Sequence, residues 1–424
     1  MNEKAYIDIL TEELIPAMGC TEPIALAYAA AKAREVLGEL PTKVCVGASG
    51  SIIKNVKSVI VPNTNHLKGI EAAVAAGIIA GMADKELEVI ADISKDKIEK
   101  ISEFLSNDCI EVYCIEDGCT FEIELKVEGN NGTAYIRIAN YHTNIVEIKK
   151  NDEVIYGKNT SVDSNDDNLT DRSLLNMKDI YEFAMNVDIS KLYNLIKMQI
   201  DYNMAIAKEG LNGDYGANIG KVLLKCEGDT VRVRAKAYAA AGSDARMNGC
   251  ELPVIINSGS GNQGITCTCP VVVYGLELGV SEEKLYRALI LSNLTAIYQK
   301  SGIGRLSAYC GAVSAGAAAG AGIAYLNGGG YKEVIHTVVN ALAIVSGMVC
   351  DGAKASCAAK IALAVDAGIL GYEMYKCGQQ FYSGDGIVAK GPDATIKNVG
   401  LLGKDGMKET NQTIINMMMG ITEK

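Results

Sequence analysis

The sequence predicts an α+β protein that is mostly helical, with a smaller α+β unit between helical segments. Helical patterns cover residues 4–37 and nearly all of 173–424, whereas short β-like runs dominate from about 41 to 158. A chain of 424 residues exceeds the usual size of one core, so two or three domains are expected. With 49% hydrophobic and only 21% charged residues, the chain can bury a large core, which excludes a disordered protein.

The composition favours closely packed helices in a cytoplasmic protein. The chain has no Trp, four Phe and 44 Gly, so its core is built from small side chains. The net charge is −11 and no cluster of Lys or Arg stands out, which argues against a nucleic-acid partner. Acidic residues run through the N-terminal apolar stretch, unlike a secretory signal. Thirteen Cys, an odd number, indicate a reducing compartment with free or metal-bound thiols.

The first expected element is a helical segment over residues 1–38, interrupted near Pro16 and ending at Gly38. A second helix start is predicted at residues 21–23, with Thr21 as N-cap and Glu22 in the first turn. Cys20 therefore lies at or just before a helix N-terminus, where the helix dipole is expected to lower the pKa of a thiol.

Residues 39–160 are expected to form the α+β domain, followed by a polar linker over 161–172. β-like runs occupy residues 42–49, 56–62, 87–93, 110–115, 120–129, 133–140 and 143–157, with helical patterns at 69–83 and 95–106. The Gly-Asn-Asn-Gly sequence at 129–132 predicts a hairpin turn. The Ser- and Gly-containing stretch 47–55 reads as a loop that could cap a site.

Residues 173–424 are expected to form a helical domain with Gly-rich connections at 242–249, 257–264, 327–330 and 378–386. Loops between rigid helices are common places for chemistry. Residues 306–327 carry no charge, and 334–350 carry none apart from His336, so both are long enough to cross a bilayer. Because Gly, Ala and Ser dominate the first stretch, buried helices of a soluble protein are favoured over a membrane protein.

Cysteine is the most informative residue type for chemistry. The three His (His66, His142, His336) lie far apart, which does not favour a His metal site or a catalytic triad, and the glycines at 259–264 lack the spacing of a phosphate loop. Cys350 and Cys357 would lie about 10.5 Å apart on a continuous helix, too far for one zinc ion. Ligation becomes possible if Asp351-Gly352 breaks the helix or if a larger cluster is bound. From their spacing alone, these cysteines are as well explained as metal ligands as they are as buried structural thiols.

Four motifs in order, GCTEP (19–23), NSGSGNQGITCTCPV (257–271), IGRLSAYCGAVSAGAAAG (303–320) and MVCDGAKASCAAK (348–360), carry a family resemblance. Together they resemble the L-cysteine desulfidase family, relatives of the iron–sulfur L-serine dehydratases of the alpha-chain type, over nearly the whole chain. The resemblance implies an oxygen-sensitive [4Fe-4S] enzyme that converts L-cysteine to pyruvate, ammonia and hydrogen sulfide without pyridoxal phosphate. It also implies that Cys310, Cys350 and Cys357 bind the cluster and that Cys20 accepts a proton.

These implied roles extend the domain prediction. Cys20 must reach a cluster held nearly 300 residues away, so the N-terminal helix is expected to pack on the C-terminal half, forming a mostly helical catalytic domain with the α+β domain inserted. Three protein ligands leave one iron open as a Lewis acid. Cys267 and Cys269 have no implied role and are expected to be structural.

The substrate contacts and the reaction keep alternatives open. Ser260, Asn262 and Gln263 offer neutral donors to a substrate carboxylate, and Lys300 or Arg305 could pair with it, although hydrogen bonding within the loops explains each equally well. One alternative reaction is dehydration of L-serine or another β-substituted amino acid. Another function is a non-catalytic iron–sulfur redox sensor. The expected partner is a small amino-acid substrate, and neither a nucleic acid nor a membrane is expected to bind. A homo-oligomer is compatible with the sequence.

Overall fold

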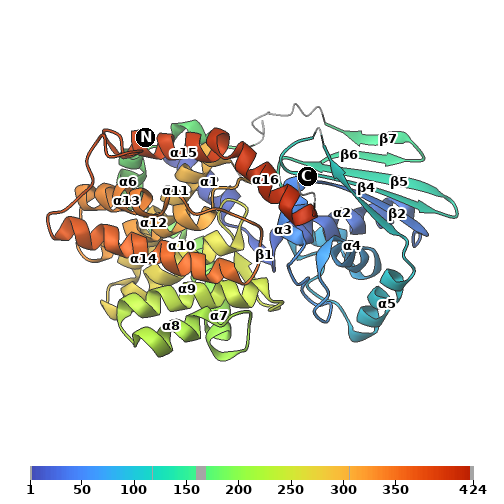
Figure 1. The fold of residues 1–424 in the computed structure, drawn as a ribbon, viewed down its shortest axis with the longest axis horizontal. Coiled ribbons are helices and arrows are strands. Elements are labelled where there is room, and N and C mark those ends of the chain that lie inside the picture. The colour runs from blue at the N-terminus through green and yellow to red at the C-terminus, as the bar shows by residue number, and fades with distance from the viewer. Residues whose placement is uncertain (1, 117, 159–168, 305, 421–424) are drawn as a thin grey trace.

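The computed structural model describes residues 2–116, 118–158, 169–304 and 306–420, and it confirms the mostly helical α+β class. Two lobes lie side by side (Figure 1). We call residues 21–158 the α+β lobe, and residues 2–18 together with 169–407 the helical lobe. Most of the predicted linker, residues 161–168, lies outside the described residues.

The strands form a two-stranded ribbon, β1 with β8, and a six-stranded sheet of order β3-β2-β4-β5-β6-β7. Their bounds are β1 Pro16–Met18, β2 Lys43–Ser49, β3 Ile110–Ile115, β4 Glu122–Gly129, β5 Gly132–Ala139, β6 Ile145–Lys150, β7 Glu153–Gly157 and β8 Pro253–Ile255.

The α-helices are α1 Glu3–Glu13, α2 Thr21–Leu37, α3 Gly50–Val56, α4 Gly69–Ala80, α5 Lys95–Ser106, α6 Met177–Asn186, α7 Tyr193–Asn212, α8 Ile219–Glu227, α9 Val231–Met247, α10 Gly261–Glu277, α11 Glu282–Ile303, α12 Gly311–Leu326, α13 Tyr331–Val345, α14 Ser356–Lys376, α15 Pro392–Leu401 and α16 Lys408–Met419. Short helical turns are η1 Ala83–Glu88, η2 Arg172–Leu174, η3 Ile189–Lys191 and the π-type η4 Leu402–Gly406.

The six-stranded sheet is antiparallel except for the parallel pair β2 and β3. Alternate residues of β4 (Ile123, Leu125, Val127) are buried, as expected for a sheet with one covered face. The hairpin prediction is confirmed, since Gly129 pairs with Gly132. The strands predicted at 56–62 and 87–93 were wrong. Both runs form turns whose apolar side chains are buried, and a short apolar run does not by itself distinguish a strand from a buried connection.

The two N-terminal helices belong to different lobes. α1 and β1 lie with the helical lobe, where β1 pairs with β8. Contrary to our expectation for residues 1–38, α2 packs mainly on α4 and on strands β4 and β5 of the α+β lobe. The reason is steric, because a Cβ at Gly77 of α4 would lie 2.2 Å from the carbonyl oxygen of Ala27, so only glycine permits this approach.

α12 lies at the centre of the helical lobe, against α10, α11, α13 and α14 (Figure 1). Gly320 of α12 and Gly368 of α14 bring the two backbones together, since a Cβ on Gly320 would lie 2.7 Å from the Gly368 carbonyl oxygen. The Gly- and Ala-rich stretch is thus a tightly packed core helix. Among the described residues, no helix is both long enough and apolar enough to cross a membrane.

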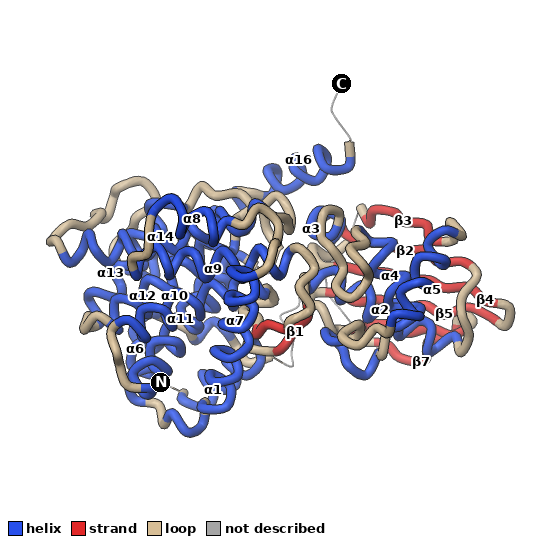
Figure 2. Tube along the Cα trace, turned by 90° about the horizontal axis from the view of Figure 1, so that it is seen from below, coloured by secondary structure: helices blue, strands red, loops and turns tan. Residues whose placement is uncertain are grey.

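The last helix connects the lobes. α16 leaves the helical lobe and contacts α3 of the α+β lobe, as both views show (Figures 1 and 2). Ile415 is buried there against Gly50, and Asn411 lies 3.4 Å from Ser51 through Nδ2 and Oγ. α3 is therefore held at the junction of the lobes, where the residues described next converge.

Candidate active site at the lobe junction

The N-terminus of α2 presents a thiol and a carboxylate in direct contact. Cys20 is the N-cap residue, and its Sγ donates to Glu22 Oε2 at 3.1 Å. Glu22 also accepts from Thr21 Oγ1 at 3.1 Å and from Asn55 Nδ2 at 2.9 Å. Thr21 Oγ1 also donates to the carbonyl oxygen of Gly259, at 2.9 Å, which ties the helix start to the 257–260 loop.

Burial sets the charges of this pair. Burial and then the charge of Glu22 raise the pKa of Cys20 well above its usual value, so the expected lowering by the helix dipole was wrong at this position. Burial also acts to raise the pKa of Glu22. His142, the hydrogen bond from Cys20 and the charge of Arg246 outweigh it, so the pKa of Glu22 is lowered. The resting pair is a thiol that donates to a carboxylate.

The three predicted cluster ligands lie on two chain segments held side by side. Tyr309 and Val349 form an isolated antiparallel bridge. Next to it, the Cys310 amide donates to the Met348 carbonyl at 3.1 Å and the Cys350 amide donates to the Ala308 carbonyl at 2.6 Å. Cys310 is also the N-cap residue of α12, and Cys310 and Cys350 flank the Tyr309–Val349 pair, one on either side of it.

A helix break at Asp351-Gly352, one of the two conditions under which Cys350 and Cys357 could share a site, is present. Residues 350–355 form a non-helical segment, and α14 begins at Ser356. Gly352 has a φ of +96°, which glycine adopts without strain. Asp351 lies 2.6 Å from Lys354 and also pairs with Lys360, and these partners lower its pKa to about 2 despite burial. The two cysteines are therefore not fixed two turns apart on one helix.

The donor set is suited to an iron–sulfur cluster. Burial raises the pKa of Cys310 to about 12, and the charges of Cys350 and then Cys357 act in the same direction. In the described parts of the chain, no three His, Cys, Asp or Glu are grouped closely enough to hold a single metal ion. Thiolates are the usual ligands of iron–sulfur clusters. The residue chemistry thus fits such a cluster.

Lys54 connects the thiol–carboxylate pair to the cysteine segments. It is 2% exposed on α3, and its Nζ donates to the Cys350 carbonyl at 3.2 Å and to Asn411 Oδ1 at 2.7 Å. Burial lowers its pKa, while Cys350 and then Glu22 act against that lowering. The stretch 47–55, expected to be a loop, is instead the end of β2 followed by α3. Ala353 packs against the buried cluster of Cys20, Val59 and Met247, so both halves of the predicted site meet here.

Other predicted contacts are distributed around α10. Asn262 Oδ1 accepts from Arg246 Nη1 at 3.1 Å, and the Gln263 side chain lies against Gly311, next to Cys310. Arg246 belongs to α9, which continues through most of the connection predicted at 242–249. The Ser260 side chain makes no capping hydrogen bond to α10.

The remaining predicted residues fall into three groups. Lys300 is buried within α11. Arg305 lies outside the described residues. Cys267 and Cys269 are fully buried in α10, where burial raises the pKa of Cys267 to about 12, as for structural thiols.

Sequence reasoning missed four side chains at this junction. Lys54 and Asn55 were treated as part of a loop, Arg246 as part of a connection, and His142 as an ordinary histidine. The only signal for them was indirect, because Lys, Asn and Arg seldom occur in segments as buried as these without a partner or a role.

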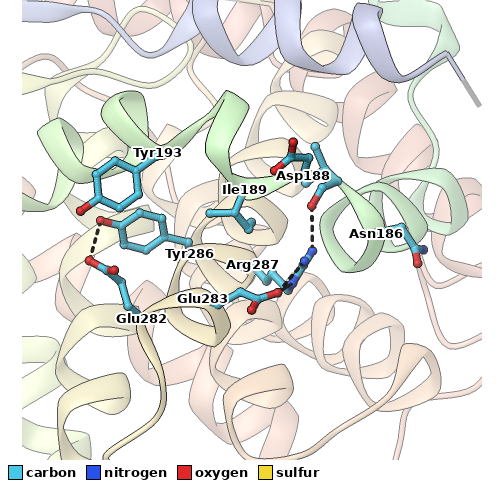
Figure 3. Close-up of a pocket in the computed structure, with 9 residues that line it drawn as sticks. Asn186, Asp188, Ile189, Tyr193, Glu282, Glu283, Tyr286 and Arg287 are labelled. Carbon is cyan, nitrogen blue, oxygen red and sulfur yellow. Dashed lines mark hydrogen bonds and ion pairs between the residues drawn. The ribbon is translucent and has the colours of Figure 1, made fainter.

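A large surface cavity lies elsewhere. It has a volume of about 480 Å³ between α6, α7 and α11, and its lining includes Arg287, which pairs with Glu283, and Tyr286, which donates to Glu282 (Figure 3). None of the predicted site residues lines it. Arg287 and Tyr286 already bind glutamates of the same lining, so this cavity is not the candidate active site.

Comparison with known proteins gives one consistent family. Residues 72–416 match the family model described as serine dehydratase alpha chain. A UPF0597 protein from Desulfitobacterium hafniense is 60% identical, covering 98% of this chain and 96% of that protein. UPF0597 proteins from Lachnoclostridium phytofermentans and Treponema denticola are 51% and 48% identical, each covering 98% of this chain and at least 97% of their own length.

Proposed function

This chain belongs to the serine dehydratase alpha chain family, and on that premise we propose that it is an L-cysteine desulfidase that depends on a [4Fe-4S] cluster. The proposed reaction is an α,β-elimination that yields pyruvate, ammonia and hydrogen sulfide without pyridoxal phosphate. The family description supports a lyase. The choice of L-cysteine rests on the four sequence motifs.

One observation carries the proposal. Cys20, which donates to Glu22, belongs to a buried cluster with Val59 and Met247, and Ala353, in the segment between Cys350 and Cys357, packs against that cluster. A thiol that can exchange its proton with a neighbouring carboxylate therefore lies beside the proposed cluster ligands. An elimination needs a base near the Cα proton and a means of stabilising the leaving group, and these two requirements correspond to the two parts of the site.

The protein's own groups perform the proton steps. Glu22 accepts the hydrogen bond from the Cys20 thiol, and Arg246 favours the thiolate form of Cys20. Transfer of the thiol proton to Glu22 runs against the raised pKa of Cys20 and the lowered pKa of Glu22, so the thiolate forms only transiently, favoured by the charge of Arg246. Its Sγ then removes the Cα proton of the substrate. Loss of sulfide from Cβ gives aminoacrylate, which tautomerises and hydrolyses to pyruvate and ammonia. Because these side chains are buried, the reaction is shielded from bulk water.

Cys310, Cys350 and Cys357 would hold the cluster. When bound, it supplies a Lewis-acidic iron that stabilises the leaving sulfur. Lys54, beside the Cys350 carbonyl, places a positive charge next to the thiolates. All thirteen cysteines are free in the structure, in keeping with the reducing cytoplasm that we propose as the location.

L-serine is the second candidate substrate, because the matching family is described as a serine dehydratase. The test is an anaerobic assay of purified protein with L-cysteine and L-serine in parallel, measuring pyruvate from both and sulfide from the first. We expect a higher kcat/KM for L-cysteine. Higher efficiency on L-serine would assign the protein as a dehydratase, and no pyruvate from either substrate would favour the redox-sensor alternative.

A further inference from the structure

A buried guanidinium that forms no direct ion pair with any described residue acts on the charge of Cys20 and Glu22. Arg246 is 2% exposed at the end of α9. Within the described part of the chain it forms no ion pair, its hydrogen bond runs from Nη1 to Asn262 Oδ1, and its Nε has no partner. A buried charge without compensation is strongly unfavourable for a folded protein. Such a group is therefore expected where an anionic ligand supplies the missing partner.

Only glycine fits beside one edge of this buried guanidinium. A Cβ at Gly261 would lie 2.2 Å from Arg246 Nε, so the absence of a side chain there keeps Nε free of a steric clash, and this buried Nε has no hydrogen-bond partner among the described residues. Asn262, the next residue, holds the guanidinium on its other side, since its Oδ1 accepts a hydrogen bond from Arg246 Nη1. A planar guanidinium held in this way is preorganised to bind a carboxylate through two parallel hydrogen bonds.

Glu22 supplies the opposite charge at the same site. The charge of Glu22 raises the pKa of the Cys20 thiol and the charge of Arg246 lowers it. No ion pair joins Glu22 and Arg246 among the described residues. Glu22 Oε1 accepts one hydrogen bond, from Asn55, so it retains accepting capacity. Asn55 Oδ1 is buried and also has no partner. The site thus contains a buried cation and a buried anion that are kept apart, each able to bind a further group.

We propose that Arg246 and Glu22 form the recognition pair for an α-amino-acid zwitterion, with Arg246 binding the α-carboxylate and Glu22, assisted by Asn55, binding the α-ammonium group. This assignment rests on the proposed function, because it names how the substrate of that lyase is held. Cys20, in contact with Glu22, is then next to the Cα hydrogen. The carboxylate contact is assigned to Arg246 in place of Lys300 or Arg305.

Binding of probes that lack one of the two groups tests this pair. L-alanine has both groups and no leaving group, whereas cysteamine has the amine and thiol but no carboxylate. Their dissociation constants are measured by isothermal titration calorimetry on anaerobically purified, cluster-loaded protein. The variants are Arg246→Met, Arg246→Lys and, as a matched control on the same helix, Arg234→Met, whose side chain pairs with Asp229 and Glu277 at the surface.

Arg246→Met should weaken L-alanine binding roughly 10- to 100-fold, the range for a lost charge-assisted pair, and change cysteamine binding by less than about threefold. Arg246→Lys should give an intermediate loss for L-alanine, and Arg234→Met should change neither. The Lys variant keeps the test available if the Met variant does not fold. Unchanged L-alanine binding, equal losses for both probes, or no L-alanine binding by the wild type would each overturn the proposal.

The outcomes separate this proposal from the proposed function. If L-cysteine is converted to pyruvate and sulfide while the dissociation constant of L-alanine is the same in the Arg246 variants as in the wild type, the recognition pair is wrong and the desulfidase assignment stands. If L-alanine binding depends on Arg246 and no sulfide is released from L-cysteine, the recognition pair stands and the desulfidase assignment is wrong.

Discussion

Substituting Gly352 by alanine should displace the segment that carries Cys350 and Cys357. Gly352 has a φ of +96°, and a Cβ there would lie 2.3 Å from the Lys54 carbonyl oxygen in α3. Strained backbone at this φ costs a non-glycine residue about 1–3 kcal/mol. Overpacking against a fixed backbone atom adds about 1–3 kcal/mol. The total, roughly 2–6 kcal/mol, can be relieved only if the 350–355 segment moves away from α3.

A matched control isolates the contact with Lys54. Gly384 has a φ of +102° with no atom within 4 Å of its would-be Cβ, so Gly384→Ala carries the backbone cost alone. Both variants are purified anaerobically, and their iron content and unfolding midpoint are compared with those of the wild type. We expect iron loss and the larger drop in midpoint only for Gly352→Ala. A Gly352→Ala protein that keeps its iron and is as stable as Gly384→Ala would refute the idea that α3 fixes the cluster segment.

Two further substitutions test separate parts of the site, and a third tests Asp244 of α9, a buried residue outside the site whose Oδ2 accepts from the Ile219 amide at 2.7 Å. Cys20→Ser keeps a donor to Glu22 but replaces the thiol with a much weaker acid, so sulfide release should fall roughly 100- to 10,000-fold at unchanged iron content; a fully active variant would exclude Cys20 as the base. Cys350→Ala should lose iron, and retention of a stoichiometric cluster would remove Cys350 from the ligand set. Burial raises the pKa of Asp244 from 3.8 to about 6, so between these values the folded state binds more protons than the unfolded state and stability falls as pH rises. In Asp244→Asn this fall should be absent from the melting temperature measured between pH 4 and 6, whereas a profile identical to that of the wild type would contradict the shift.

Some of the site could be predicted because its signals are local in sequence. The Asp351-Gly352 step indicated a break between Cys350 and Cys357, and the break is present because glycine adopts the positive φ required there. The start of α2 next to Cys20 was likewise read from Pro23 and its neighbours. These features depend on residues within a few positions of one another.

The contacts that complete the site are not local. Lys54 and Arg246 come from α3 and α9, and each acquires its role only when the two lobes meet. The pKa of Cys20 was predicted from the helix dipole alone, whereas burial by Val59 and Met247, together with Glu22, reverses the direction. Tertiary burial therefore outweighed the local electrostatic rule.

The position of α2 could not be read from periodicity. Its sequence is rich in alanine, and 13 of its 17 residues are buried, so it has no single apolar stripe that would indicate a packing partner. Gly77 permits α4 to approach the α2 backbone at Ala27. This contact joins positions 50 residues apart in the sequence, so a local pattern does not indicate it.

The central claim is that this protein is an iron–sulfur lyase. The most direct test is to measure iron and acid-labile sulfide in anaerobically purified protein and, in the same sample, pyruvate and sulfide release from L-cysteine before and after exposure to air. We predict about four iron and four sulfide per chain, with activity lost in parallel with the cluster. Protein that is free of iron and still releases sulfide and pyruvate at the full rate would contradict the account.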